Sequence, residues 1–575
     1  MPSGQPNIQL EIDHLQAGDT FKFGSLEIDK PLVLRGLRGT QANPIRLIGQ
    51  PAKKGTLSQT VFRGEYTYES YKDLANKLSR AHEAGGDYPG LGYLAQSAAI
   101  YMVDCQWVIL EHLSFVDCWP TAIYIDNSQH LELRHLHFRG GTFAIGADGR
   151  ETRHLLIEDC DWIQDPNDDA EADIRSIHKE NRVPLKKNRQ FSRLYREISW
   201  ERIHRAFSSE TTLVDVTESA DGVHTDERIF DGDFFRAWTI RGYVILRNNI
   251  IVDAFNGIHS YNHASNDIRP NFNRHFLIEN NWFVRIRDNA IEPENHFRNW
   301  TARHNCFVDC FAAFSIEPEE SGYLYIYGNL SWAHYRPGPG ISGDNGLEKD
   351  DRLTGRHFKW GSRHQAFGPH YILYNTWFAR ASHFKKKRFS GLIHANNVVG
   401  YNDEAEEFNP EAISPFGVDW NKAPTPTDAL RDPRKREKNR FTKAWEELNI
   451  IFDGDMIGQE DFPSALRAAG YGLGPASSGT KPEFVSTTID KDHGLKLKNA
   501  QPAIDVPIFY PDYNASFARA TQVDGSNYVV GAWQKDGLFT LPDPLFVSYW
   551  QYALPFAPED KAEGSEDVPA GQAGV

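Results

Sequence analysis

A short apolar motif recurs along this chain, and its spacing restricts the fold more than any other feature. An isoleucine or valine precedes polar and often acidic residues at Ile100, Ile123, Ile145, Val223, Ile258, Ile291 and Ile316. The short intervals are 23, 22 and 25 residues, whereas intervals of 78, 35 and 33 residues indicate inserted loops. One such repeat cannot bury its apolar face alone, so successive repeats must stack. The spacing predicts a parallel β-solenoid of 22–25 residues per coil, because a propeller needs repeats of about 40–50 residues.

Two further series of residues accompany this motif. Asparagines precede apolar residues at Asn249, Asn281, Asn305 and Asn375, and a small residue follows an aspartate at Cys118, Cys160, Ala254 and Cys310. We interpret both series as side chains stacked inside turns, which would explain the fold rather than a chemistry. The other cysteines are Cys105 and Cys306, and no CxxC pair typical of zinc sites occurs. An odd number of cysteines also argues against a complete disulfide framework.

Three segments interrupt the repeat. The insertion at about 62–95 has apolar residues at helical spacing in "YKDLANKLSRAHEAGG", and the insertion at 162–215 is rich in lysine and arginine. The second insertion ends directly before Val223, a position from which it could touch a substrate. Beyond residue 400 the repeat is lost. We therefore expect a β-helix over residues 1–400 with these two insertions, and an irregular segment over 401–575 that packs on it or caps it.

Net charge and the distribution of apolar residues exclude several classes of partner. The formal net charge is −16, which disfavours non-specific binding to nucleic acid. No run approaches 18 apolar residues, so no membrane span is expected. The N-terminal "MPSGQPNIQLEID" lacks the basic-then-apolar pattern of a secretory leader. The sequence leaves localisation open: secreted or periplasmic if a signal peptide has been removed, and cytoplasmic otherwise.

Both ends of the repeat resemble a known superfamily. The segment "LQAGDTFKFGSLEIDKPLVLRGLRGTQANPIRLIG" (15–49) resembles the opening coil of pectin-lyase-like proteins, including alginate lyases and chondroitinase B-type lyases. "LKLKNAQPAIDVP" and "YVVGAWQ" are similar to their closing segment, so the resemblance covers roughly residues 15–400 and this tail. It implies an all-β, right-handed parallel β-helix that acts on carbohydrate. Such motifs specify the fold better than the reaction.

Side chains alternate between the two faces of a strand, so the residues one and three places after each repeated isoleucine should share the outer, solvent-facing side. On the later coils these are His224 with Asp226, His259 with Tyr261, Glu292 with Glu294, and Glu317 with Glu319. The two Ile-Glu-Pro-Glu segments should then stack, with Glu292 about 4.8 Å from Glu317. Such like charges destabilise a sheet unless one carboxyl is protonated or a cation lies between them.

Paired carboxylates favour a glycoside hydrolase that cleaves a poly- or oligosaccharide, because one acid and one ionised carboxylate must flank the scissile bond. Stacked Glu292 and Glu317 would suit the roughly 5 Å of a retaining pair, and Glu292 and Glu294, about 6.6 Å apart along a strand, an inverting pair. The catalytic candidates are Glu292, Glu294, Glu317, Glu319 and Asp226. The substrate-binding candidates are His224, His259, Tyr261 and Trp332. This reaction requires no cofactor.

A polysaccharide lyase or epimerase acting on a uronate polymer is the alternative. In that interpretation Glu292, Glu294, Glu317 and Glu319 would bind calcium, and a histidine or Tyr261 would act as the base. The basic insertion and "HFKKKRF" (383–389) would suit an anionic polymer. However, the lysine–arginine pair of chondroitinase B-type lyases is not matched, because its positions fall near His296 and on Glu317. A non-catalytic glycan-binding β-helix is a further alternative, although its binding face should be aromatic-rich and poor in carboxylates.

Overall fold

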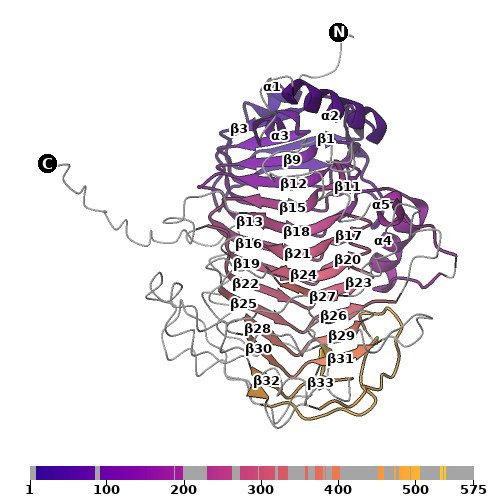
Figure 1. Cartoon of the computed structure of the whole chain (residues 1–575). Coiled ribbons are helices and arrows are strands. Elements are labelled where there is room, and N and C mark those ends of the chain that lie inside the picture. Colours follow the sequence, from indigo (N-terminus) through magenta and orange to yellow (C-terminus); the bar gives the residue numbers. More distant parts are fainter. Residues whose placement is uncertain are drawn as a thin grey trace, which may run out of the picture.

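The computed structural model is shown in Figure 1. It describes residues 8–83, 91–186, 188–197, 229–261, 272–294, 297–316, 322–334, 356–360, 370–379, 383, 392–401, 451–458, 472–473, 478–492, 494–504, 531–534 and 537–538. Three long parallel sheets run along the molecule, and each strand pairs with the equivalent strand of the preceding and following coil. The chain therefore forms the predicted right-handed parallel β-helix, in which crossover connections between parallel strands are right-handed.

The three sheets are named A, B and C in the order in which most coils visit them. Sheet A consists of β1 (Thr20–Gly24), β4 (Ile45–Gly49), β7 (Gln106–Glu111), β10 (Gln129–Arg134), β13 (Arg153–Glu158), β16 (Gly242–Arg247), β19 (Arg274–Glu279), β22 (Arg298–Arg303), β25 (Gly322–Tyr327), β28 (His370–Leu373), β30 (Leu392–Ala395), β32 (Ile451–Asp453) and β34 (Gly472–Leu473). Sheet B consists of β2 (Leu26–Ile28), β5 (Thr60–Arg63), β8 (Ser114–Val116), β11 (His137–Arg139), β14 (Asp161–Ile163), β17 (Ile250–Val252), β20 (Trp282–Val284), β23 (Cys306–Val308), β26 (Leu330–Trp332), β29 (Thr376–Ala379), β31 (Val398–Tyr401) and β33 (Met456–Ile457).

Sheet C consists of β3 (Leu32–Arg35), β6 (Ile100–Val103), β9 (Thr121–Asp126), β12 (Phe143–Asp148), β15 (Asp233–Trp238), β18 (Asn256–Tyr261), β21 (Asn289–Pro293), β24 (Ala312–Ile316) and β27 (Arg356–Trp360). A separate antiparallel pair is formed by β35 (Trp533–Gln534) and β36 (Gly537–Leu538). The strands β32, β33 and β34 lie beyond residue 400, so the parallel sheets continue past the boundary that the sequence predicted.

The repeated isoleucines form the core of sheet C, with two corrections. Ile100, Ile123 and Ile145 pair in register, as do Ile258 and Ile291, and all five are buried. The position expected for Val223, between Ile145 and Ile258, is occupied by Phe235. The partner of Ile291 on the next coil is Phe314 and not Ile316. Phe314 and Ile316 are both buried in the core, two residues apart on one strand, so alternation alone could not decide between them.

The asparagine series is confirmed as a ladder in the turn from sheet A to sheet B. The backbone N–H of each asparagine donates to the side-chain oxygen of the next one, as from Asn281 to Asn305 at 3.0 Å and from Asn305 to Asn329 at 2.9 Å. The Cys160 N–H donates to Asn249 in the same way. Cys160 thus belongs to this ladder and not, as expected, to the series of Cys118, Ala254 and Cys310, each of which lies two residues after a strand of sheet B. All five cysteines are buried and free.

The two predicted insertions carry the longer helices. The first contains α2 (Tyr68–Glu83) and α3 (Leu91–Ser97), and the second contains α4 (Asp168–Glu180) and α5 (Arg193–Glu197), while α1 (Ile8–Ile12) precedes β1. Helix α3 packs its Leu94 among the aromatic rings of Tyr124, Phe143 and Trp238 on sheet C. Helix α4 packs against β14 and β17 of sheet B. No helix in the described ranges is long and apolar enough to cross a membrane.

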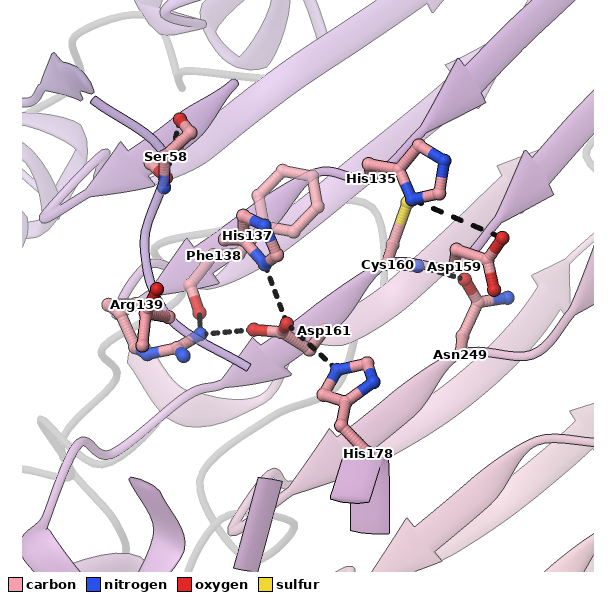
Figure 2. A network of polar contacts seen from close by, with 12 residues as sticks. Ser58, His135, His137, Phe138, Arg139, Asp159, Cys160, Asp161, His178 and Asn249 are labelled. Carbon is pink, nitrogen blue, oxygen red and sulfur yellow. Dashed lines mark hydrogen bonds and ion pairs between the residues drawn. The ribbon is translucent and has the colours of Figure 1, made fainter. Parts of the chain in front are cut away.

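A buried ion network fastens α4 to sheet B. Figure 2 shows the Asp161 carboxylate between His137 and His178, with Arg139 on its other side. Asp161 Oδ2 lies 2.6 Å from His137 Nδ1 and 3.6 Å from His178 Nε2, and Arg139 donates to Asp161 Oδ1 at 2.6 Å. Arg139 also pairs with Glu171 of α4 at 2.5 Å. Burial alone would raise the pKa of Asp161, but His137 and Arg139 hold that pKa well below the usual value. We therefore interpret this network as a structural contact that holds α4 against sheet B.

Candidate functional site

The outer face of sheet C carries a row of ionisable side chains on successive coils. Arg236 of β15 pairs in register with His259 of β18, and His259 pairs with Glu292 of β21. On the next coil Ser315 follows Phe314, the partner of Ile291, and Lys359 of β27 pairs with Ser315. The order along the helix axis is therefore arginine, histidine, glutamate, serine and lysine. The small Ser315 leaves space for Lys359 to approach Glu292, and their charged atoms are 3.8 Å apart.

His259 is the centre of this cluster. Its Nε2 lies 3.0 Å from Glu294 Oε2, and its Nδ1 lies 3.6 Å from Glu292 Oε2. Asp233, the first residue of β15, places Oδ1 3.3 Å from the same Nδ1. The Arg236 guanidinium contacts the ring as well and lies 3.4 Å from Asp233 Oδ2. One imidazole thus joins three carboxylates.

Burial and charge balance distinguish the cluster from an ordinary exposed strand face. The side chains of His259, Glu292 and Glu294 are 6%, 8% and 13% exposed. We expected these residues to face solvent, and that expectation is wrong, because they lie on the outer side of the sheet yet inside the molecule. Three carboxylates face three basic side chains, and this pairing offsets the cost of burying charge.

The surroundings of His259 favour its protonated form. Burial and the nearby Arg236 charge each lower the pKa of His259, but Glu292 and Asp233 outweigh them and raise it to about 10. The raised pKa favours an imidazole protonated on both nitrogens at neutral pH, a form that can donate a proton to a group placed at Glu294. A protonated ring cannot act as a base, which bears on the reaction that this cluster can perform.

The structure brings three of the predicted site residues together: His259, Glu292 and Glu294. Tyr261 ends β18 in register with Trp238, on the same strand as His259. Trp332 does not join them, because it is buried on β26 of sheet B among Ile489 and Leu495. His224, Asp226, Glu317 and Glu319 lie outside the described residues.

The predicted stacking of the two Ile-Glu-Pro-Glu segments is wrong. Because Ile291 pairs with Phe314, the residue that follows Glu292 along the axis is Ser315 rather than Glu317. Among the described residues, the charged side chains closest to Glu292 include the basic His259 and Lys359, at 3.6 Å and 3.8 Å. This register removes the electrostatic cost that stacked glutamates would have carried.

Sequence reasoning missed Asp233, Arg236 and Lys359. A signal was present for the first two, because Phe235 lies 23 residues before Ile258, the length of one coil, whereas Val223 lies 35 residues before it. Likewise Phe314 lies 23 residues after Ile291. Lys359 follows a long interval without a repeat, so its coil could not be placed by spacing.

The described part of the chain contains no group of three or more His, Cys, Asp or Glu side chains arranged to hold a metal ion. Two of the four glutamates proposed as calcium ligands, Glu317 and Glu319, lie outside that part. Within the described ranges, the basic groups of His259 and Lys359 lie beside the Glu292 carboxylate.

Comparisons with known proteins leave the reaction open. No protein-family model matches the chain, and no curated protein matches it. Among solved structures it is similar to an alginate lyase of polysaccharide lyase family 6 in complex with a trisaccharide (10% identity, TM-score 0.35, covering 70% of this chain and 77% of that one). It is also similar to a pectate lyase (10% identity, TM-score 0.33, covering 91% of this chain and 90% of that one). A third similar structure is a family 28 exopolygalacturonase from Yersinia enterocolitica (10% identity, TM-score 0.30, covering 68% of this chain and 71% of that one). Identities and TM-scores this low identify neither a family nor a reaction.

Proposed function

We propose that this protein is a glycoside hydrolase that cleaves a poly- or oligosaccharide at the His259 cluster. The observation that carries the proposal is that Glu292 of β21 and Glu294, the residue directly after that strand, both contact the same protonated imidazole. Residues spaced in this way lie about 6.6 Å apart along an extended strand, within the roughly 6.5–9.5 Å of inverting enzymes.

Glu292 is the general base in this proposal. Lys359 at 3.8 Å and His259 at 3.6 Å favour its ionised form. Its carboxylate takes a proton from water while the water oxygen bonds to the anomeric carbon. The bond from that carbon to the leaving-group oxygen breaks in the same step, so one water is consumed for each linkage cleaved.

The proton for the leaving group comes from the hydrogen-bonded pair of His259 and Glu294. The two side chains share a proton across 3.0 Å, and the raised pKa of His259 keeps that proton in place near neutral pH. The departing oxygen accepts it, and the proton that Glu292 received restores the pair through solvent. An acid and a base with different environments are the arrangement that glycoside hydrolysis requires.

A lyase remains the second candidate because one specific observation favours it. Arg236 and Lys359 stand on the same outer face as His259, so two cations could neutralise a uronate carboxylate. The lyase ranks second because His259, its nearest candidate base, is held protonated by Glu292 and Asp233.

Product analysis separates these reactions. The purified protein is incubated with a panel of neutral and uronate-containing polysaccharides, and products are measured by mass spectrometry. Products that gain one water per cleavage support the hydrolase, whereas products with an unsaturated end and no added water identify a lyase. Tight binding of a glycan without any product contradicts both and assigns the chain to the glycan-binding alternative.

A further inference from the structure

The start of β15 carries a carboxylate where neighbouring coils do not. The first residue of the sheet C strand is Phe143 in β12, Asn256 in β18 and Asn289 in β21, and it is Asp233 in β15. An asparagine side chain at this position can accept a hydrogen bond from the backbone N–H of the next coil, as Asn256 Oδ1 does from the Asn289 N–H at 3.0 Å. The fold therefore does not require a charge at residue 233. The charge occurs on the coil next to His259.

Asp233 is placed to act on His259. It is 1% exposed, and its two carboxylate oxygens face His259 Nδ1 at 3.3 Å and Arg236 at 3.4 Å. Glu294 occupies the other ring nitrogen, Nε2, at 3.0 Å. A carboxylate on one nitrogen fixes the rotation of an imidazole and the direction in which the other N–H points.

We infer that Asp233 is a positioning residue, which holds the His259 ring so that its Nε2–H points at Glu294 and the pair keeps the proton for the leaving group. This inference rests on the proposed hydrolysis and goes beyond it, because it names the group that prepares the proton donor. Glu292 also faces Nδ1, at 3.6 Å, but it is shared with Lys359 and serves as the base. Asp233 does not touch the substrate in this arrangement.

Asp233→Asn tests the inference, since asparagine is the residue that the next two coils carry at this position. Histidine carbons are labelled with 13C, and His259→Gln assigns the resonance of His259. Removing the opposite charge should lower the titration midpoint of His259 by about 1–3 pH units, while Arg236, Glu292 and Glu294 still face the ring. In the hydrolase assay, kcat should fall with little change in KM, and the alkaline limb of its pH profile should move to lower pH.

Two further variants complete the design. Asp233→Glu keeps the charge and should restore most of the wild-type titration. Asp159→Asn is the matched control, because Asp159 lies 4.0 Å from the exposed His135 in the turn after β10 and should leave His259 and the activity unchanged. An unchanged His259 titration in folded Asp233→Asn, or equal shifts in both Asp233 variants, would overturn the inference.

The titration needs no substrate, so it separates this inference from the proposed function. If the titration of His259 shifts in Asp233→Asn but the wild-type protein cleaves no glycan, the positioning role of Asp233 is supported and the proposed hydrolysis is contradicted. Cleavage with an unshifted titration would support the hydrolase and contradict the role of Asp233.

Discussion

Glu292 and Glu294 have different surroundings although only Pro293, the last residue of β21, separates them. Glu292 lies between Lys359 and His259, whereas Glu294 bonds to the other nitrogen of His259. Two carboxyl groups in different environments can take different roles, one as the general base and the other within the pair that donates the proton. The assignment of roles follows from these contacts.

Replacement of either glutamate should remove most of the activity. We expect Glu292→Gln and Glu294→Gln each to lower kcat by about 10²–10⁴-fold, the usual effect of losing a general acid or base. Initial rates on the cleaved glycan measure this. Glu151→Gln is the control, because Glu151 is 63% exposed and lies in the connection between β12 and β13. Full activity in Glu292→Gln would show that the chemistry lies elsewhere.

Metal removal tests whether the glutamates need a cation from solution. Since Lys359 and His259 already offset the charge of Glu292, we expect dialysis against a chelator to leave the hydrolysis rate unchanged. Loss of activity on chelation with recovery on adding calcium would instead point to the calcium-assisted lyase.

At the scale of single residues, alternation along the strands correctly grouped His259, Glu292 and Glu294. It could not find Asp233, because that residue lies at the start of its strand and not in the repeated motif. Nor could it rank Phe314 against Ile316, which face the same side of one strand. A shift of two residues preserves every inward and outward assignment while changing which side chains stack.

At the scale of strands, the asparagine ladder sets how coils meet. Each asparagine side-chain oxygen accepts hydrogen bonds from the asparagine of the preceding coil, and its backbone N–H and side-chain amide donate to the asparagine of the next coil. Asn305 does so with Asn281 and Asn329, at 2.9–3.1 Å. Sheet A adds a second constraint on its outer face, where the last strand residues alternate in charge. They are Glu111, Arg134, Glu158, Arg247, Glu279 and Arg303. A coil shifted out of register would separate these oppositely charged pairs.

Loss of one ladder asparagine should cost more than an ordinary polar substitution. Asn305→Ala leaves the buried N–H and side-chain amide of Asn281 without their acceptor, so we expect the free energy of unfolding to fall by about 1–3 kcal/mol or more. Denaturant unfolding measures this change. Asn43→Ala is the control, because Asn43 is exposed. Equal stabilities of the two variants would argue against the ladder.

At the scale of the whole molecule, a histidine chain crosses the core near the C-terminal coils. His357 Nδ1 lies 2.8 Å from His383, His383 lies 3.1 Å from His394, and His394 Nδ1 lies 2.9 Å from Asp455. All four are buried. Asp455 also accepts from Asn397, so this chain meets the end of the asparagine ladder. The repeat predicted the solenoid but not this polar crossing, because His383 lies in a stretch without the repeated motif.

The histidine chain should make stability depend on pH. Burial lowers the pKa of His357 from 6.5 to about 3 and that of His383 well below its usual value. Between these values the unfolded chain binds more protons, so the free energy of unfolding should fall as pH drops from about 6.5 towards 3. Asp455, whose pKa is raised by burial, acts in the opposite direction.

Denaturant unfolding at a series of pH values checks this dependence. His357→Gln, which cannot be protonated, should flatten the fall in stability between pH 6.5 and 3. His135→Gln replaces a histidine that is 43% exposed and should leave the slope as it is. The same slope in both variants would exclude His357 as a source of the pH dependence.

The most direct test of hydrolysis at the Glu292–Glu294 pair uses digestion in 18O-labelled water. Wild-type protein and Glu292→Gln are incubated with the polysaccharide panel, and the masses of the products are measured by mass spectrometry. We predict that wild-type products carry one 18O at each new reducing end and that Glu292→Gln produces almost none. Unsaturated products without 18O, or equal labelled product from both proteins, would contradict the assignment.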